Sequence, residues 1–319
     1  MTLTELRYIV ALAREKHFGR AAAACFVSQP TLSVAIKKVE ENLGVALFER
    51  SVQDVRVTEV GARVVAQAQV VLREADVIHE LVTQNNNPLV GSLNVGIIYS
   101  IAPYLLPRLM QSLPALLPQM PLIVQENYTH QLIEWLKQGR IDVAILALPI
   151  DASGFEVAPL YDEPFFVTVA KNHAWAKRRE ISNQELSQEA LLVLGAGHCF
   201  REHVLQSAPK APVYAVADGE MLRSFEGSSL ETLRYMAAAG VGVTVLPALA
   251  AQSNTHDGLR YIPLIHAKGS KGAPPSRRVV LVWRKQFSRE QACVALAQAV
   301  RNCGLVGVDV LPELTVSTS

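Results

Sequence analysis

The apolar and polar positions of the first 58 residues alternate with the period of short helices. Apolar residues spaced three and four apart after Thr4 predict a first helix capped by that threonine. An alanine-rich helix is expected over 19–25, and a third helix over 29–43 begins after Ser28, which can act as its N-cap. The segment 49–58 is expected to form a two-stranded wing. This order is typical of a winged helix-turn-helix.

The third helix has two different faces, which we interpret as a core face and a DNA face. Its apolar residues share one side and are expected to be buried; they are Leu32, Ile36, Val39 and Leu43. Small polar and basic groups on the other side suit a DNA groove, where hydroxyls and lysines reach phosphates. Lys37 and Lys38 alone would be explained as a solvated face, but the turn, the buried face and the wing favour DNA binding. The candidate DNA-binding residues are Arg20, Gln29, Pro30, Thr31, Ser33, Val34, Lys37, Lys38, Arg50 and Arg56.

A long helix with a heptad seam is predicted to follow the wing. Apolar residues recur in steps of three and four from Val60 to Val82, at Val60, Val64, Ala68, Val71, Ala75, Ile78 and Val82. Such a seam indicates a partner helix and therefore a homodimer, whereas the alternative is a helix packed on its own domain. The polar stretch at 84–88 is typical of a hinge and argues against that alternative.

After Gly91 the pattern changes to alternating strands and helices. Buried strands are expected at 93–97, 142–148, 165–170, 191–194, 243–246 and 278–283, with helices at 129–137, 229–239 and 288–302. This alternation is typical of an α/β domain with a parallel sheet. No short repeat is present, which excludes a solenoid.

The bulk properties exclude several classes of protein. A chain of 319 residues is expected to form two or three domains, and a net charge of +1 does not identify a partner. No export signal and no membrane span is predicted, so we expect a cytoplasmic protein without membrane contact. The four cysteines lie far apart without ligand spacing, which indicates neither a disulfide-stapled domain nor a metal site, and no cofactor is expected.

Cys199 has a sequence context that favours reactivity. It follows the apolar run 191–194, the loop 195–197 and His198, and it begins a helical segment. The positive end of a helix dipole and the nearby His198, Arg201 and His203 favour the thiolate, which is the form that attacks peroxide. By contrast, Cys25 and Cys293 lie on apolar helix faces and are expected to be buried, and Cys303 is not classified.

The N-terminal motifs resemble those of LysR-type transcriptional regulators. The runs FGRAA at 18–22, VSQPTLS at 27–33, EENLG at 40–44 and LFER at 47–50 carry this resemblance. It implies a winged helix-turn-helix (1–58), a linker helix and hinge (59–90), and an effector module of two subdomains shaped like a periplasmic binding protein. Those subdomains would comprise 91–163 with 269–303, and 164–268, followed by a tail (304–319). The implied partners are double-stranded promoter DNA, RNA polymerase and further copies of the chain, in a homodimer that assembles to a homotetramer.

The region of Cys199 is similar to the peroxide-sensing members of that family. The runs GHCFR at 197–201, PYLLP at 103–107, THQL at 129–132, DEP at 162–164 and SLETLR at 229–234 carry the similarity. It implies that hydrogen peroxide is the signal, and that Ser100, Thr129 and His198 bind it beside the peroxidatic Cys199. Helix capping would also explain Ser100 and Thr129. Arg278 matches a supporting basic residue, although Arg277 lies beside it.

One position departs from the peroxide-sensing pattern. Those relatives carry a resolving cysteine nine residues after the first, and this chain has Ala208 there. The usual intramolecular disulfide therefore cannot form. Either the cysteine was replaced in an engineered variant, or a natural protein switches as sulfenic acid or through another thiol.

Two other classes of function compete with a peroxide-sensing regulator of antioxidant genes. A LysR-type regulator that binds a small organic effector between the subdomains would share the fold and leave Cys199 incidental. A stand-alone thiol peroxidase would need a resolving thiol and has no use for the helix-turn-helix, so we do not expect an enzyme.

Overall fold

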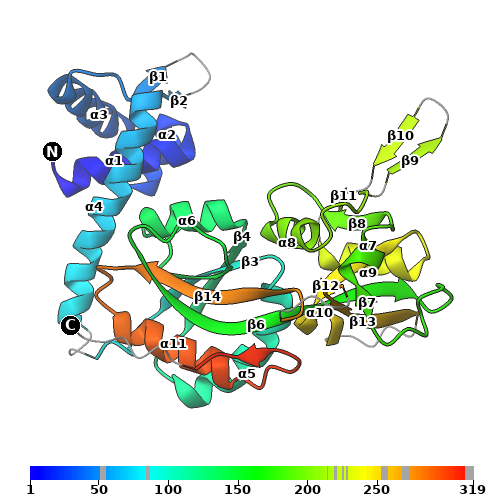
Figure 1. Ribbon diagram of the computed structural model, residues 1–319. Helices are drawn as coiled ribbons and strands as arrows, with labels where there is room; N and C mark the ends of the chain where they lie inside the picture. The colour runs from blue at the N-terminus through cyan, green and yellow to red at the C-terminus, as the bar shows by residue number, and fades with distance from the viewer. Residues whose placement is uncertain are drawn as a thin grey trace. The chain divides into compact units, whose positions relative to one another are not determined.

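The chain forms two compact units. The computed structural model describes residues 1–50, 55–83, 87–213, 215–218, 221–224, 226–227, 229–252, 258–267 and 273–312. One unit contains residues 1–87 together with 138–140, and the other contains residues 88–137 and 141–319. Figure 1 shows the largely helical first unit in blue to cyan and the α/β second unit in cyan, green, yellow and red. Among the described residues, no helix combines the length and apolarity that a membrane span requires.

The first unit is a helix-turn-helix with a wing. Its helices are α1 (Leu3–Glu15), α2 (Phe18–Ala24) and α3 (Gln29–Leu43), and its strands are β1 (Phe48–Arg50) and β2 (Val55–Val57). Ser28 caps α3 as predicted, because its hydroxyl accepts from the backbone N–H of Thr31. The predicted cap of the first helix is wrong: Thr2, in a capping box with Glu5, begins α1 earlier than Thr4 would.

Glu40 connects the end of α3 to the wing. Its carboxylate accepts from the backbone N–H groups of Leu47 and Phe48 at 2.8 and 3.0 Å. Leu32, Ile36 and Val39 are buried as predicted, but Leu43 is exposed, since α3 ends there at Gly44 in the left-handed conformation.

The predicted linker helix is confirmed as α4 (Glu59–Thr83). Its first half belongs to the core of the unit: Ala68 is buried, and Val64 and Leu72 pack against that core. Further along, Val71 is 39% and Ile78 is 63% exposed. Val71 and Ile78 are thus accessible within one chain, and their pairing with a partner helix stays a prediction, while Ala68 follows the alternative of packing within its own domain.

In its described residues, the second unit is built on a mixed sheet of eleven strands, whose main path runs β11-β8-β12-β6-β14-β5-β3-β4. Its strands are β3 (Leu93–Ile98), β4 (Leu122–Asn127), β5 (Val143–Ala147), β6 (Phe155–Ala170), β7 (Ile181–Ser182), β8 (Leu191–Leu194), β11 (Glu226–Gly227), β12 (Val243–Pro247), β13 (Leu259–Ile265), β14 (Ser276–Arg284) and β15 (Asp309–Val310). A separate hairpin consists of β9 (Ala215–Asp218) and β10 (Met221–Ser224). The helices are α5 (Ala102–Leu116), α6 (Thr129–Lys137), α7 (Asn183–Leu186), α8 (Cys199–Ser207), α9 (Leu230–Ala238), α10 (Ala248–Gln252) and α11 (Glu290–Asn302).

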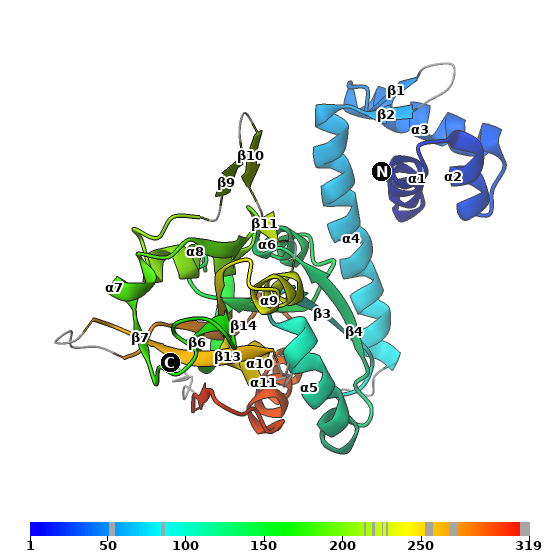
Figure 2. The ribbon, with the colours of Figure 1, turned by 90° about the vertical axis from the view of Figure 1, so that its right-hand side faces the viewer.

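The long strand β6 joins the two halves of this sheet. Residues 155–164 pair with β14, whereas residues 165–170 pair with β12 and β13. The partner strands change between Pro164 and Phe165. One half of the sheet, with β3, β4 and β5, has α5, α6 and α11 beside it, and the other half carries α7 to α10 (Figures 1 and 2).

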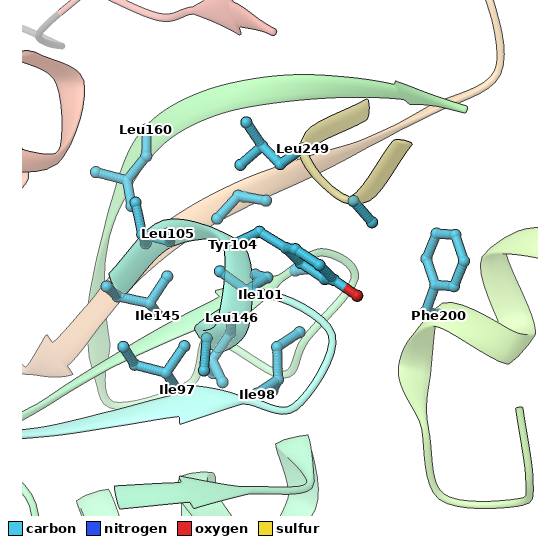
Figure 3. Close-up of a cluster of buried hydrophobic side chains, with 14 of the residues drawn as sticks. Ile97, Ile98, Ile101, Tyr104, Leu105, Ile145, Leu146, Leu160, Phe200 and Leu249 are labelled. Carbon is cyan, nitrogen blue, oxygen red and sulfur yellow. The ribbon is translucent and has the colours of Figure 1, made fainter. Parts of the chain in front are cut away.

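Side chains from both halves share one hydrophobic cluster. Figure 3 shows Tyr104 and Leu105 of α5 and Ile97 of β3 in the same close-up as Phe200 of α8 and Leu249 of α10. A polar contact also joins the halves, since Tyr104 donates from its hydroxyl to Glu231 of α9 at 2.8 Å. Figure 2 shows α5 and α9 side by side at this contact.

Arg289 fixes the first residues of the second unit. Its guanidinium donates to four backbone carbonyls, those of Pro88, Ser92, Val90 and Gly91, at 2.7–3.1 Å. The side chain lies just before α11 and is buried. A guanidinium has five N–H donors in a rigid fork, so one residue satisfies four carbonyls of an irregular segment.

We predict that Arg289→Met frees this segment while keeping the aliphatic stem of the side chain. Four carbonyls lose a charged donor, so the free energy of unfolding of the second unit should fall by about 2–4 kcal/mol. Hydrogen exchange at residues 90–93 should rise in the same variant. Arg108→Met is the matched control, because Arg108 is half-buried and gives one such bond, to Gly304. Unchanged exchange in Arg289→Met would show that other contacts hold the segment.

Candidate peroxide site

A small cavity brings together four of the predicted site residues. It is lined by Ser100, Thr129, His198 and Cys199, together with Ile98, Tyr99, Asn127, Tyr128 and Gly197. About 10 Å³ of this space is open to the centre of a water-sized molecule. That is room for one very small ligand.

The ends of two parallel strands place the two hydroxyls of the cavity. Ser100 follows β3 and Thr129 follows β4, and these neighbouring strands run parallel in register from Leu93–Leu122 to Ile98–Asn127. Gly96 lets α6 approach β3, because a Cβ at Gly96 would meet side-chain atoms of Leu132 and Ile141 at 2.6–2.7 Å. Close packing of α6 on β3 therefore sets where Thr129 lies.

Cys199 is the first residue of α8, and His198 is its N-cap. The loop before it turns at Gly197, which has φ of +95°. Cys199 is partly buried, and His198 is buried. The sulfur therefore lies at the end of a helix where the first backbone N–H groups lack helical partners.

Arg277, and not Arg278, supports the cavity. Arg277 is buried and donates to the Ser100 hydroxyl at 2.7 Å and to the Ser100 carbonyl at 3.0 Å. Its Nε donates to Glu163 at 2.8 Å, and Glu163 also accepts from the backbone N–H of Leu249. The prediction of a site role for Arg278 is wrong, because neighbouring strand residues face opposite ways and Arg278 points outward to Asp162 at 2.8 Å.

The two hydroxyls of the cavity are not used as helix caps. Ile101 is the N-cap of α5, so Ser100 lies outside that helix end. Since a guanidinium only donates, the Ser100 oxygen accepts from Arg277 and its own hydrogen remains available to a ligand. The Thr129 hydroxyl is buried and has no hydrogen-bond partner among the described residues. An unpaired buried hydroxyl beside a small cavity is what a polar ligand would satisfy.

Two aromatic residues of the cavity lining, Tyr99 and Tyr128, were missed by the sequence prediction. Tyr99 packs edge-on against Tyr128 at 5.3 Å between ring centroids, and Tyr128 packs edge-on against His198 at 4.8 Å. Each tyrosine directly precedes a predicted hydroxyl residue, Ser100 or Thr129. That repeated order at two strand ends is the signal that could have identified the pair.

The other cysteines have environments that favour the neutral thiol. Cys293 and Cys303 are buried and Cys25 is partly buried. Burial raises the pKa of each of these three thiols. Ala208, which the resemblance to peroxide-sensing members of the family predicts to stand where those members have a resolving cysteine, is fully buried at the C-terminal end of α8.

The predicted DNA-binding residues lie mostly on exposed positions of the first unit. Gln29, Pro30, Thr31, Lys37, Lys38, Arg20 and Arg56 are exposed, Val34 is 68% exposed, and Ser33 is half-buried. Lys37 lies 3.7 Å from Glu41, an exposed pair that contributes little stability. The side chain of Arg50 lies outside the described residues.

Comparison with known families identifies both units. Residues 3–62 match the bacterial regulatory helix-turn-helix protein, lysR family, and residues 86–303 match the LysR substrate binding domain. The chain belongs to the LysR family. This LysR-family chain is confirmed to combine a helix-turn-helix with a two-subdomain module like a periplasmic binding protein.

Individual relatives of this LysR-family chain carry the name OxyR. The DNA-binding transcriptional dual regulator OxyR of Escherichia coli K12 is 39% identical over 302 residues, which cover 94% of this chain and 95% of that protein. A full-length OxyR variant from Pseudomonas aeruginosa is 45% identical with a TM-score of 0.75, covering 95% of this chain and 99% of that one. A Corynebacterium glutamicum OxyR mutant with hydrogen peroxide bound is 33% identical with a TM-score of 0.62, covering 95% and 92%.

His203 anchors α8 from inside the protein. It is buried, and its Nε2 donates to the backbone carbonyl of Leu148 at 2.6 Å. Its Nδ1 is buried without a partner among the described residues. Burial lowers the pKa of His203, and the nearby charge of Arg277 lowers it further, against the opposing effects of Leu148 and Glu202.

We predict that His203 makes the second unit sensitive to mild acid. Because its pKa is lowered on folding, the unfolded chain takes up a proton first as the pH falls below about 6.5. The free energy of unfolding should therefore decrease below that pH, and His203→Gln should remove part of the decrease while retaining a donor for Leu148. Denaturant titrations between about pH 7 and pH 5 measure this, with the exposed His130→Gln as control. Parallel pH profiles for wild type and His203→Gln would contradict the prediction.

Proposed function

We propose that this chain is a DNA-binding regulator of antioxidant genes that is switched by the reaction of hydrogen peroxide with Cys199. The observation that carries the proposal is the cavity in which Cys199 meets Ser100, Thr129 and His198. Its accessible space corresponds to about one water molecule, which is far closer to the size of hydrogen peroxide than to that of an ordinary organic effector. The peroxide-related names of the relatives support the same signal.

The proposed chemistry is a two-electron oxidation of the thiolate. The sulfur attacks one peroxide oxygen, a sulfur–oxygen bond forms and the oxygen–oxygen bond breaks. The sulfur is oxidised to sulfenic acid, and the departing hydroxide takes a proton and becomes water. Ser100 and Thr129 would hold the peroxide by hydrogen bonds, and His198 would polarise the departing oxygen. Arg277 would act on the reaction only through Ser100, as a positioning residue.

Ala208 determines the fate of the sulfenic acid. With no thiol at that position, and with Cys25, Cys293 and Cys303 held as neutral thiols, the sulfenic acid at Cys199 would persist or oxidise further to sulfinic acid. The switch would then depend on an oxygen added beside α8 instead of a new disulfide.

We also propose how the first unit is used. The exposed face of α3 would enter the major groove and the wing would contact phosphates, with Lys37 and Arg56 among the contacts. Exposed Val71 and Ile78 on α4 would pair with the same residues of a second copy, giving a homodimer on a two-fold symmetric site and, through further contacts, a homotetramer.

Intact-mass analysis and footprinting test the proposed signal. After one equivalent of hydrogen peroxide, wild-type protein should gain one oxygen atom that maps to Cys199, and its footprint on promoter DNA should change. Cys199→Ser should keep the footprint and lose the peroxide response, whereas Lys37→Ala should weaken binding with and without peroxide. Loss of two hydrogens would show that a second thiol resolves Cys199. A footprint of Cys199→Ser that still responds to an organic effector would favour the alternative regulator.

Sedimentation tests the proposed dimer. Replacing Val71 and Ile78 together by Asp would bury unpaired charge in the seam, at a cost of several kcal/mol, about that of an isolated buried ion. The double variant should sediment as a smaller species and keep its fold, because both side chains are exposed within one chain. Gln69→Asp adds a charge at another exposed position of α4 and serves as the control. An unchanged assembly in the double variant would reject the seam.

A further inference from the structure

Three rings beside Cys199 form a cluster, and the proposed reaction uses the His198 ring but neither of the two tyrosine rings. This ring cluster consists of Tyr99, Tyr128 and His198, and each ring is close to both others, with centroid distances of 5.3, 4.8 and 6.0 Å. All three residues line the cavity that contains the sulfur. Aromatic rings that pack on one another in this way form a stiff wall.

The loop that carries the cysteine packs directly against one of these rings. A Cβ at Gly197 would lie 3.5 Å from the Tyr128 ring, at ordinary van der Waals contact. Tyr128 also stacks with His130, at 5.8 Å and an interplanar angle of 10°. Tyr128 therefore neighbours both the 195–198 loop and His130, and a shift of its ring would disturb these contacts.

The accessible space of the cavity that these rings line is much smaller than an alkyl hydroperoxide. Its 10 Å³ of accessible space corresponds to about one water molecule. We propose that Tyr99 and Tyr128 are specificity-determining residues, which admit hydrogen peroxide to Cys199 and exclude organic hydroperoxides. This inference rests on the proposed peroxide reaction at Cys199.

The reaction itself does not discriminate between these peroxides. With an organic hydroperoxide the thiolate sulfur would also gain one oxygen as the oxygen–oxygen bond breaks, and the departing alkoxide would take a proton and leave as an alcohol. The two reactions differ in the alkyl group attached to the departing oxygen. Selectivity therefore has to come from the space around the sulfur, and the tyrosine rings line that space.

The first measurement compares oxidants on wild-type protein. Rates of oxygen addition at Cys199 are measured by mass spectrometry with hydrogen peroxide, tert-butyl hydroperoxide and cumene hydroperoxide, and each is divided by the rate for free cysteine in the same buffer. The corrected rate with hydrogen peroxide should exceed both others by about tenfold or more, the scale at which a pocket rejects bulk. Equal corrected rates in wild-type protein would overturn the inference without any variant.

The second measurement uses variants that lack one of the two tyrosine rings. Tyr99→Ala and Tyr128→Ala should each raise the corrected rate with tert-butyl hydroperoxide by about tenfold. Tyr128→Phe keeps the ring and should keep the selectivity. Tyr235→Ala is the matched control, since Tyr235 is an exposed tyrosine on α9 outside the cavity lining. If an alanine variant fails to fold, Tyr99→Leu or Tyr128→Leu replaces it.

The outcomes separate this inference from the proposed function. If no peroxide oxidises wild-type Cys199, the proposed function is rejected, and the specificity-determining role of Tyr99 and Tyr128 is rejected with it. If hydrogen peroxide oxidises Cys199 but the alanine variants keep the wild-type selectivity, only the specificity-determining role of Tyr99 and Tyr128 is rejected. The specificity-determining role is also rejected if the selectivity of the alanine variants falls solely because their rate with hydrogen peroxide drops. The rings would then position hydrogen peroxide and would not exclude larger peroxides.

Discussion

The buried ion pair between Arg277 and Glu163 is the contact on which the second unit depends. Both side chains are almost fully inaccessible to water, and their charged atoms lie 2.8 Å apart. A buried charge is tolerated only when its hydrogen-bonding capacity is satisfied, and removal of one partner costs about 3–5 kcal/mol. Ser100 and the backbone of Leu249 supply the remaining bonds of this pair. One ion pair therefore fixes the cavity edge, strand β6 and the start of α10 together.

The same arginine also contacts the helix that carries the cysteine. Its guanidinium lies 5.0 Å from the centre of the Phe200 ring, and Phe200 packs edge-on against Phe165 at 5.3 Å. Phe200 directly follows Cys199, so the backbone at the sulfur is held by a buried ring one residue away. Phe165 is the first residue of β6 that pairs with the second half of the sheet. These contacts connect the residue after Cys199 to the point where the two halves of the sheet are joined.

Periodic patterns predicted the helices more completely than the site. The spacing of apolar residues located α4 and α6, and Ser229 and Ser28 marked true helix starts. The first half of β6 was missed because Pro159 and Pro164 interrupt it, although the strand accommodates Pro159 at a register shift opposite Val280. The alternation of apolar and polar residues could not show which of Arg277 and Arg278 faces the cavity, because the valines and the leucine that follow make both faces of β14 apolar.

The packing around Ala208 constrains how a signal could leave the cavity. Ala208 is fully buried, and its backbone N–H donates to the carbonyl of Val204, so the end of α8 is part of the core. His203 holds the middle of the helix to Leu148, at the end of β5. With both points fixed and no thiol at 208, oxidation would not draw α8 out of place as a disulfide would. A structural change caused by oxidation would instead pass through the start of α8. There Phe200 contacts Arg277, whose ion pair with Glu163 connects the two halves of the sheet.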